Sequence, residues 1–447
     1  MDLLEWAPPE ELAHWVRDAT DRLLAAVGDL GESVEEDPRW VGPYLEILNP
    51  PLWELGHVGW FAEELVHRRL HGRAGLSEDI DRFYDSAEVS HRSRWEMTLP
   101  TPRRTRDYVR RVGDSLAELV LDDGGLDMTA HFATYAVAHH DAHVEALTYT
   151  RQTLGLPAPF VSPRRSFDHD PSASGDVEVA GGPALLGGSR HQPFVMDNEK
   201  WAHRVRVEPF SMARTAVTMA DFAEFVDDGG YGADRLWSTE GRTWRDEVGA
   251  THPVYWRGSP SSGWEHRSGE VWRPLDGDAH HPVHHVNWHE AQAWCAWADR
   301  RLPTEAEWEF AASTGPDGTK RWQFPWEAEF GDPVRAGSTE HDARAALDGR
   351  TGGVVDVTAF ADGDGPWGHR QLFGNVWEWT DDAFEPYPNF EPDAYRENSE
   401  PWFGTRRVLR GGSWASRSRS VRATARNFFT PDRRDVFAGF RTCATER

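Results

Sequence analysis

Three histidines in the N-terminal third of the chain have residue types and spacing that suit metal binding. His139 and His143 are four residues apart in ATYAVAHHDAHVEALTYTRQTL, whose pattern predicts a helix. Residues i and i+4 lie on one helix face, so both imidazoles can reach the same ion. His57 lies in an apolar stretch of another predicted helix, LWELGHVGWFAEELVHRRL. A neutral imidazole on an apolar face needs a partner, so the sequence predicts one mononuclear metal ion held by His57, His139 and His143.

The spacing leaves the kind of metal open. Three histidines with water in the fourth position suit zinc, whereas iron oxygenases usually replace one histidine with a carboxylate. Five acids lie close to the histidines along the chain: Glu54, Glu63, Glu64, Asp141 and Glu145. His131 and His140 are also nearby, and we expect His140 to face solvent or to lie behind the ligands. A lone HxxxH is common, and a single buried histidine is more often bonded to backbone than to metal.

The elements expected to hold these histidines are amphipathic helices. Apolar residues recur at helical spacing in four segments, at 11–30, 52–70, 105–121 and 133–154. Four such helices predict a bundle over residues 1–157. Residues 158–180 are rich in Pro, Ser and Asp and are typical of a linker. From 181 to 447, short strand-like runs bounded by Gly and Pro, with a helix at 289–301, predict an irregular α+β domain.

Composition restricts the partners. The 447 residues carry a net charge of −26, and Lys200 and Lys320 are the only lysines. An acidic surface repels nucleic acid and anionic lipid, so we expect neither as a partner. Arginine with abundant acids suggests a halophilic, high-salt cytoplasm or a GC-rich genome. Two cysteines, Cys295 and Cys443, exclude a disulfide framework and fit a cytoplasmic location. The chain has no run of eighteen apolar residues, and its first residues lack signal-peptide features.

Four strings in the C-terminal half are specific. They are RLPTEAEWEFAA at 301–312, LFGNVWEWTDD at 372–382, RVLRGGSW at 407–414 and FAGFRTC at 437–443. Together they resemble the formylglycine-generating-enzyme (sulfatase-modifying factor) family, whose fold is related to C-type lectins. Most of these residues are interpreted as scaffold. Members that generate formylglycine hold copper with a cysteine pair, and Cys295 and Cys443 both lie in scaffold segments, so that activity is not expected here.

WELGHVGWF and HHDAHVE resemble the DinB-like bundle. A DinB-like bundle ahead of this lectin-like fold is the architecture of the ergothioneine sulfoxide synthases. The resemblance implies an α + (α+β) fold, with an N-terminal DinB-like four-helix bundle and a C-terminal C-type-lectin-like formylglycine-generating-enzyme fold. It implies a non-heme iron(II) ion (Fe2+) held by His57, His139 and His143. It also implies O2-dependent bonding of sulfur to the imidazole C2 of hercynine, the trimethylated betaine of histidine.

The resemblance implies roles for further residues. Tyr395, in DAYRENSEPWFG, matches a tyrosine that donates a proton during the oxygen chemistry; the alternative is a loop tyrosine that stabilises a turn. Asn427 matches an asparagine that holds hercynine. Phe428 and Phe429 offer aromatic faces that suit a quaternary ammonium, although such residues are more often part of the core.

The chain departs from one branch of the family at positions that bear on the sulfur donor. Members that use γ-glutamylcysteine tend to read Asn-Trp-Asp-x-Pro-x-Arg-Arg, and Phe429 stands where the acid would meet the donor's ammonium. A glutamine common before the second helix histidine is Ala142. NPPLWELGHVGWF and SAEVSHRSRWEMTLP are closer to the selenoneine synthases, which join a selenosugar to hercynine. A thiol and a selenosugar therefore both remain candidates.

Three arginines are predicted to bind a carboxylate of the donor. Arg92 and Arg94 lie in SHRSRW, and Arg433 lies in PDRRD. A guanidinium pairs with a carboxylate through two parallel hydrogen bonds. The alternative is that these arginines pair with nearby acids of the chain. The second function considered is a non-catalytic sugar- or ligand-binding protein with a lectin-like domain and a structural zinc.

Overall fold

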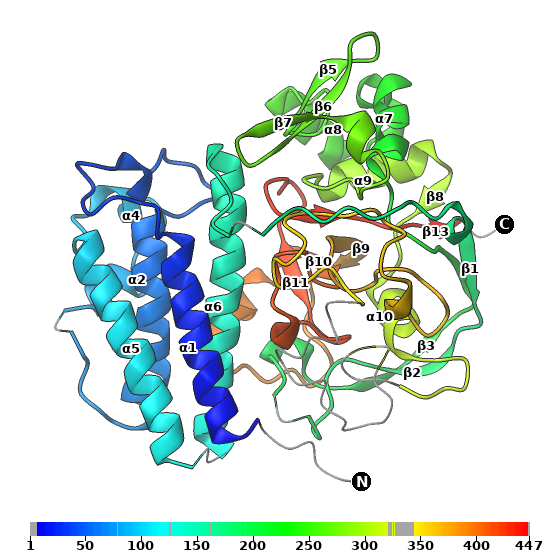
Figure 1. Cartoon of the computed structure of the whole chain (residues 1–447). Helices are drawn as coiled ribbons and strands as arrows, with labels where there is room; N and C mark the ends of the chain where they lie inside the picture. Colours follow the sequence, from blue (N-terminus) through cyan, green and yellow to red (C-terminus); the bar gives the residue numbers. More distant parts are fainter. Residues whose placement is uncertain are drawn as a thin grey trace. The chain divides into compact units, whose positions relative to one another are not determined.

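The described part of the chain divides into two compact units (Figure 1). The first comprises Met1–Phe160 with His191–Phe194, and the second comprises Val161–Arg190 with Val195–Arg447. The computed structural model describes residues 7–77, 79–124, 127–160, 162–192, 194–320, 324, 326 and 344–445.

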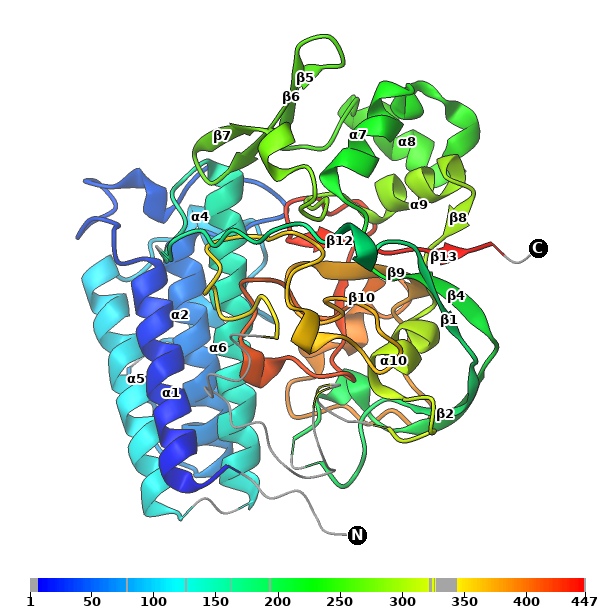
Figure 2. The same cartoon turned by 45° about the vertical axis from the view of Figure 1, so that its right-hand side comes forward.

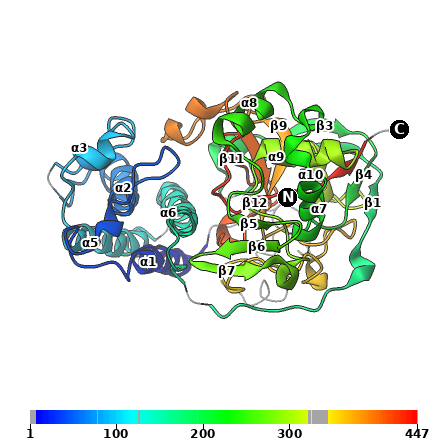
Figure 3. The same cartoon turned by 90° about the horizontal axis from the view of Figure 1, so that it is seen from above.

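The first unit is helical. Its long helices are α1 (Pro9–Ala26), α2 (Pro51–Ala62), α5 (Pro102–Asp122) and α6 (Asp127–Leu154), and its short ones are α3 (Asp81–Tyr84) and α4 (Ser93–Glu96). The four long helices lie alongside one another, as their end-on view in Figure 3 shows. Both α1 and α2 pack against α5 and α6, which closes the apolar faces of all four around one interior.

The four predicted helices are confirmed, but their ends differ from the prediction. The helix predicted at 11–30 ends at Ala26, and the helix predicted at 105–121 begins at Pro102. The helix predicted at 52–70 is an α-helix only as far as Ala62 and continues as the π-helix η2 (Glu63–Leu70). Helix α6 begins six residues before the predicted start at 133. Proline occupies the first turn of α1, α2 and α5, where its missing N–H costs no helical hydrogen bond. Among the residues that the structure describes, no helix has the length and apolarity needed to cross a bilayer.

The second unit is an α+β arrangement of short elements. Its helices are α7 (Met219–Asp227), α8 (Thr239–Val248), α9 (Trp288–Trp297) and α10 (Glu305–Ser313). Its first strands are β1 (Asp176–Val179), β2 (Gly182–Leu186), β3 (His203–Val207), β4 (Phe210–Ala213), β5 (Trp256–Ser259), β6 (Gly263–Ser268) and β7 (Val271–Pro274). The later strands are β8 (Arg300–Arg301), β9 (Trp377–Ala383), β10 (Arg407–Arg410), β11 (Asn427–Phe429), β12 (Ala438–Gly439) and β13 (Cys443–Ala444).

The strands form four small sheets joined by long loops (Figure 2). Their orders are β1-β4-β13-β8, β11-β10-β9-β12, β2-β3 and β5-β6-β7. The segment predicted as a linker, 158–180, includes a 3-10 turn at Pro171–Ala173 and the whole of β1. The helix predicted at 289–301 ends at Trp297, and its last two predicted residues form β8.

The four specific strings meet in the core of the second unit. The buried Glu378, from the second string, accepts hydrogen bonds at 2.7 Å from the Trp308 indole and from both Nε and an Nη of Arg441. Arg410, from the third string, is fully buried and pairs with Glu305 and Glu309 of the first. Buried charges persist only when paired and hydrogen-bonded, so these residues are scaffold, as predicted.

Turn and cap residues explain the rest of these strings. Thr304 caps α10 by accepting from the Glu307 N–H, while the Glu307 carboxylate accepts from the Thr304 N–H at 2.8 Å. Gly411 has φ +97°, and a Cβ there would lie 2.4 Å from the Leu372 carbonyl oxygen. Only glycine fits this close approach.

Candidate metal centre

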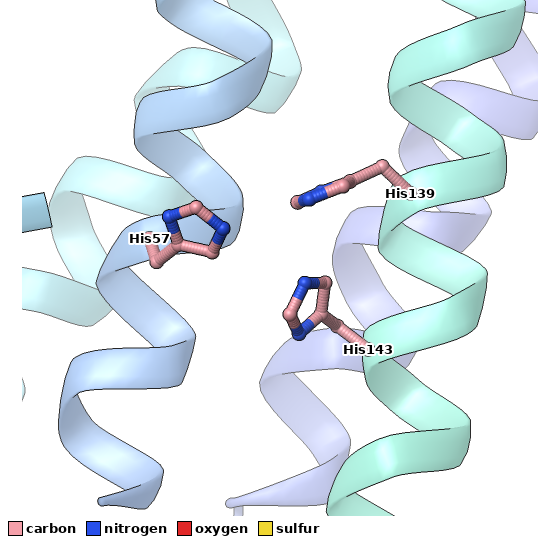
Figure 4. Close-up of side chains that lie close together, drawn as sticks. All are labelled: His57, His139 and His143. Carbon is pink, nitrogen blue, oxygen red and sulfur yellow. The ribbon is translucent and has the colours of Figure 1, made fainter. Parts of the chain in front are cut away.

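His57, His139 and His143 converge in the helical unit. His57 projects from α2, and His139 and His143 project from α6 toward it (Figure 4). One ring nitrogen from each lies within 4.8 Å of the others. His57 is buried, and the other two are partly exposed. Within the described residues, these histidines are the one group of potential ligands gathered closely enough to share an ion.

Hydrogen bonds to Nδ1 orient two of the three rings. His57 Nδ1 donates to the Tyr84 carbonyl oxygen at 2.9 Å, because a carbonyl can only accept. His143 Nδ1 lies 2.9 Å from Oε1 of Glu54, which is 2% exposed. With the carboxylate ionised, Nδ1 carries the hydrogen in both rings and each Nε2 keeps a free lone pair. These tautomers are the ones that bind a metal through Nε2.

The close packing of α3 on α2 places the Tyr84 carbonyl. A Cβ on Gly56 would lie 2.1 and 2.3 Å from two ring carbons of Tyr84 and 2.5 Å from its hydroxyl oxygen, so glycine is required next to His57. The Tyr84 ring is fully buried there, and its hydroxyl lies 3.3 Å from that of Thr105. The glycine in WELGH therefore leaves the space that Tyr84 needs to hold the following histidine in its orientation.

The histidine rings are held in an apolar, aromatic setting. The Phe61 ring stacks on His139 with centroids 3.7 Å apart and planes 9° apart. Burial, with the neighbouring His143, lowers the pKa of His57 to about 3. Burial, with His143 and His57, also holds the pKa of His139 well below its usual value. Both imidazoles are therefore neutral near pH 7, the form that binds metals.

The arrangement fits a divalent transition-metal ion. Imidazole nitrogen suits zinc, copper, iron and nickel, and three converging ligands leave further coordination positions for exogenous groups. His140 lies outside the group. Its Nδ1 is 2.8 Å from the Ala136 carbonyl oxygen of its own helix, and its side chain is buried rather than exposed to solvent.

The five nearby acids differ in what they contact. Glu54 contacts His143. Glu63 is fully buried and accepts from Tyr108 and from the Leu76 N–H. Glu64 pairs with Arg68 and Arg69. Asp141 and Glu145 are buried on α6. Among the residues that the structure describes, none of these five acids belongs to the group of converging ligands.

Tyr395 lies in the second unit, just before the 3-10 turn Arg396–Asn398, and is partly exposed. The buried Asp197 anchors this loop. Its carboxylate accepts from Ser399 Oγ at 2.7 Å and from Asn398 Nδ2 at 3.1 Å. The backbone around the tyrosine is therefore fixed by a residue about two hundred positions away.

The residues predicted to bind hercynine and the donor in the second unit lie on β11 and the turn after it. Asn427 Oδ1 accepts from the Phe428 N–H at 2.8 Å. The Phe428 ring stacks on Phe384, with centroids 4.0 Å apart. The Arg433 guanidinium lies 4.9 Å from the Phe429 ring centroid and donates to both carboxylate oxygens of Asp435, at 2.6 and 2.7 Å. The acid that partners Arg433 thus belongs to the chain itself.

Arg92 and Arg94 lie in the helical unit. Arg92 is exposed and pairs with Glu96 at 3.1 Å. Arg94 donates to Asn49 Oδ1 at 2.6 Å, and its guanidinium lies 3.8 Å from the Trp53 ring centroid. Arg92 pairs with an acid of the chain, as the alternative interpretation expects, whereas Arg94 contacts an amide oxygen and an indole ring. Their predicted contact with a donor stays a prediction.

The two cysteines lie on a helix and a strand of the second unit. Cys295 on α9 and Cys443 on β13 are both free and buried. Burial raises the pKa of the Cys443 thiol to about 12 and raises that of Cys295 as well. Thiolates are the form that binds metals, and the expectation that formylglycine generation is not the activity stays a prediction.

Sequence reasoning missed one contributor to the site and did not single out another. The Tyr84 carbonyl is backbone from 27 residues along the chain, and a backbone group leaves no signal in residue type. Glu54 was one of five candidates. The i,i+3 spacing of Glu54 and His57 puts them on one face of α2 and could have favoured it over the others.

The site and the fold define a class of protein, a helical unit with a three-histidine centre joined to a domain of the sulfatase-modifying-factor type. The family described as sulfatase-modifying factor enzyme 1-like domain matches residues 164–446. A hercynine oxygenase of Mycobacterium tuberculosis is 36% identical over 441 residues, covering 97% of this chain and 98% of the relative.

Two further relatives show how much of this chain is similar to known proteins. A hercynine oxygenase of Mycolicibacterium smegmatis is 35% identical over 419 residues, 89% of this chain and 91% of the relative. A formylglycine-generating enzyme of Streptomyces coelicolor is 33% identical over 305 residues, 65% of this chain and 93% of the relative. The chain belongs to the hercynine oxygenase family, the sulfoxide synthases of ergothioneine biosynthesis that carry a formylglycine-generating-enzyme-like domain.

Proposed function

We propose that this chain is an iron(II)- and O2-dependent enzyme that joins sulfur or selenium to the imidazole C2 of hercynine. The observation that carries the proposal is the convergence of one ring nitrogen each from His57, His139 and His143 within 4.8 Å. Membership of the hercynine oxygenase family supports hercynine as the substrate and O2 as the oxidant.

The electron balance needs no further co-reactant for a thiol donor. Joining the C2–H of hercynine to an S–H removes two hydrogens and is a two-electron oxidation. Adding one oxygen atom to the sulfur is a second two-electron oxidation. One O2 accepts the four electrons, and its atoms end in the sulfoxide and in water.

Each residue of the proposed site has its own role in the reaction. A bound iron(II) ion supplies a redox centre with positions open to O2 and to a thiolate or selenolate. The three neutral imidazoles hold it without cancelling its charge, which favours an anionic donor atom. Tyr395 delivers a proton to the oxygen that leaves as water. Asn427 and Phe428 hold hercynine, whose trimethylammonium suits an aromatic face.

The proposal includes the architecture. A DinB-like four-helix bundle over residues 1–157 carries the metal, 158–180 is a linker, and 181–447 is the formylglycine-generating-enzyme-like domain. The side-by-side packing of α1, α2, α5 and α6 supports the bundle. The match of residues 164–446 to the sulfatase-modifying-factor family supports the second domain.

A thiol and a selenosugar both remain possible donors. Phe429, under the Arg433 guanidinium, is apolar where a donor ammonium would need a carboxylate. Burying an ammonium without a counter-charge is costly, whereas a sugar needs none. Arg92, Arg94 and Arg433 are the proposed partners of a donor carboxylate.

The test is a competition assay with protein purified without oxygen and loaded with iron(II). Hercynine, O2, γ-glutamylcysteine, cysteine and a selenosugar are supplied together, and the products are identified by mass. We expect one coupled product and oxygen consumption that depends on hercynine, with His143→Ala as the inactive control. Stoichiometric zinc in the isolated protein, with no oxygen consumption after iron is supplied, would support the non-catalytic, lectin-like alternative instead.

A further inference from the structure

The three histidines are not equivalent in what lies behind them. His57 Nδ1 donates to a neutral carbonyl, that of Tyr84. His143 Nδ1 faces a carboxylate, that of Glu54, at the same distance of 2.9 Å. A charged acceptor polarises the N–H much more strongly than a neutral one does, which raises the electron density at Nε2 on the far side of the ring.

Glu54 lies where its charge is not screened by water. It is 2% exposed, on the first turn of α2, and it reaches across to His143 on α6. A buried carboxylate is costly unless it is paired, and a neutral imidazole N–H compensates it only in part. A metal cation bound to Nε2 of His143 would supply the missing positive charge, on the far side of the ring from the Glu54 carboxylate.

Mononuclear iron sites commonly combine two histidines with one carboxylate ligand. This site has three imidazoles, and its carboxylate stands one hydrogen bond behind His143. We propose that Glu54 is a positioning residue that holds His143 in the Nδ1–H tautomer and lends the centre the negative charge that a ligand carboxylate would otherwise supply. This inference rests on the proposed function, since it takes the three histidines to be metal ligands.

The test removes the negative charge of Glu54 and keeps the size and shape of its side chain. Glu54→Gln is neutral. Its side-chain oxygen can still accept the hydrogen bond from His143 Nδ1. If its amide N–H instead donates to Nδ1, His143 is forced into the opposite tautomer. Metal affinity is measured by chelator competition, with iron(II) without oxygen and with cobalt(II) in air, together with the visible spectrum of bound cobalt. We expect affinity 10- to 100-fold weaker than that of the unaltered protein, with shifted cobalt bands.

Glu64→Gln is the matched control. Glu64 follows α2 directly, at the start of η2, and pairs with Arg68 and Arg69 rather than with a histidine. It should keep the metal affinity within about two-fold, because its partly exposed ion pairs do not involve a histidine of the site. Glu54→Asp keeps the charge and should restore the cobalt spectrum with an intermediate affinity, which a purely structural role of Glu54 would not predict.

The outcomes separate the inference from the proposed function. Stoichiometric binding by the unaltered protein with equal affinity and spectrum in Glu54→Gln would overturn the role of Glu54 alone. No metal binding by the unaltered protein would overturn both. Thermal unfolding of the metal-free variants checks that they fold. If Glu54→Gln does not fold, the comparison of Glu54→Asp with Glu64→Asp decides, and equal affinities in that pair would reject the inference.

Discussion

The indole of Trp53 lies parallel to the imidazole of His57, with ring centroids 4.8 Å apart and planes 9° apart. The indole N–H donates to the Phe83 carbonyl oxygen at 2.7 Å, next to the Tyr84 carbonyl that holds His57 Nδ1. The Arg94 guanidinium also lies against this indole, 3.8 Å from the ring centroid. One buried aromatic ring therefore links a predicted metal ligand to an arginine predicted to bind the donor.

Removing this ring should weaken both the fold and the metal site. Trp53→Ala leaves a cavity beside His57 and should lower the free energy of unfolding by about 3–5 kcal/mol. Trp53→Phe keeps an aromatic face and should lose less. Urea denaturation of the metal-free proteins, followed by cobalt(II) titration, measures the two effects. Unchanged stability and affinity in Trp53→Ala would show that the stack has no structural role.

The identity of the ligands can be tested on a single helix. His139→Ala or His143→Ala should abolish stoichiometric metal binding, because two imidazoles cannot hold the ion at its full affinity. His140→Ala should keep most of it, since the His140 ring is bonded to the Ala136 carbonyl oxygen. Metal content is measured after dialysis against excess iron(II) without oxygen. Equal loss in all three variants would mean that the register on α6 is wrong.

The role of Tyr395 is tested by removing only its hydroxyl. Tyr395→Phe should bind both substrates with little change in affinity but form little of the coupled product, with thiol oxidation as the side reaction. Tyr44→Phe, at a residue 40% exposed in the helical unit, is the control and should keep the product ratio. Products are quantified by mass at several time points. An unchanged rate and ratio in Tyr395→Phe would leave Tyr395 as a residue that stabilises its loop.

Two arginines predicted to bind the donor should differ in their effect on stability. Asp435 is 3% exposed and Arg433 is 16% exposed, so Arg433→Ala leaves a buried carboxylate unpaired. We expect a loss of about 3 kcal/mol in the free energy of unfolding. Arg92 and Glu96 are 71% and 64% exposed, so Arg92→Ala should cost under ~0.5 kcal/mol. Denaturant titrations of both variants measure the difference, and equal losses would contradict it.

Stability should fall as the pH drops below about 6.5. Burial lowers the pKa of His284 and of His369 to about 3, so both stay neutral in the folded protein while the unfolded chain takes up protons. The unfolded state is then favoured as the pH falls from 6.5 toward 3, by about 2 kcal/mol per such histidine by pH 5. Unfolding free energies of the metal-free protein at pH 7.5, 6 and 5 measure the slope. His369→Gln should reduce it, and an unchanged slope would argue against its burial as a neutral group.

Much of the secondary structure and part of the site were predictable from local pattern. The i,i+4 spacing of His139 and His143 required only that α6 be a helix, and helical periodicity is a short-range property. The ends of elements were less predictable. The change from α2 to a π-helix at Glu63 and the end of α9 at Trp297 depend on packing that residue type does not report.

The sequence by itself determined which side chains can bind a metal and on which helix faces they lie, because residue type and helical period are local. Only the tertiary structure decided that His57 lies close to His139 and His143 of α6. It also decided that Glu54, rather than one of the four other acids, contacts His143, and that Arg433 pairs with Asp435. These relationships join positions far apart in the chain or choose among chemically equal neighbours. The choice follows from the side-chain packing of each folded unit, where every buried charge must find a partner.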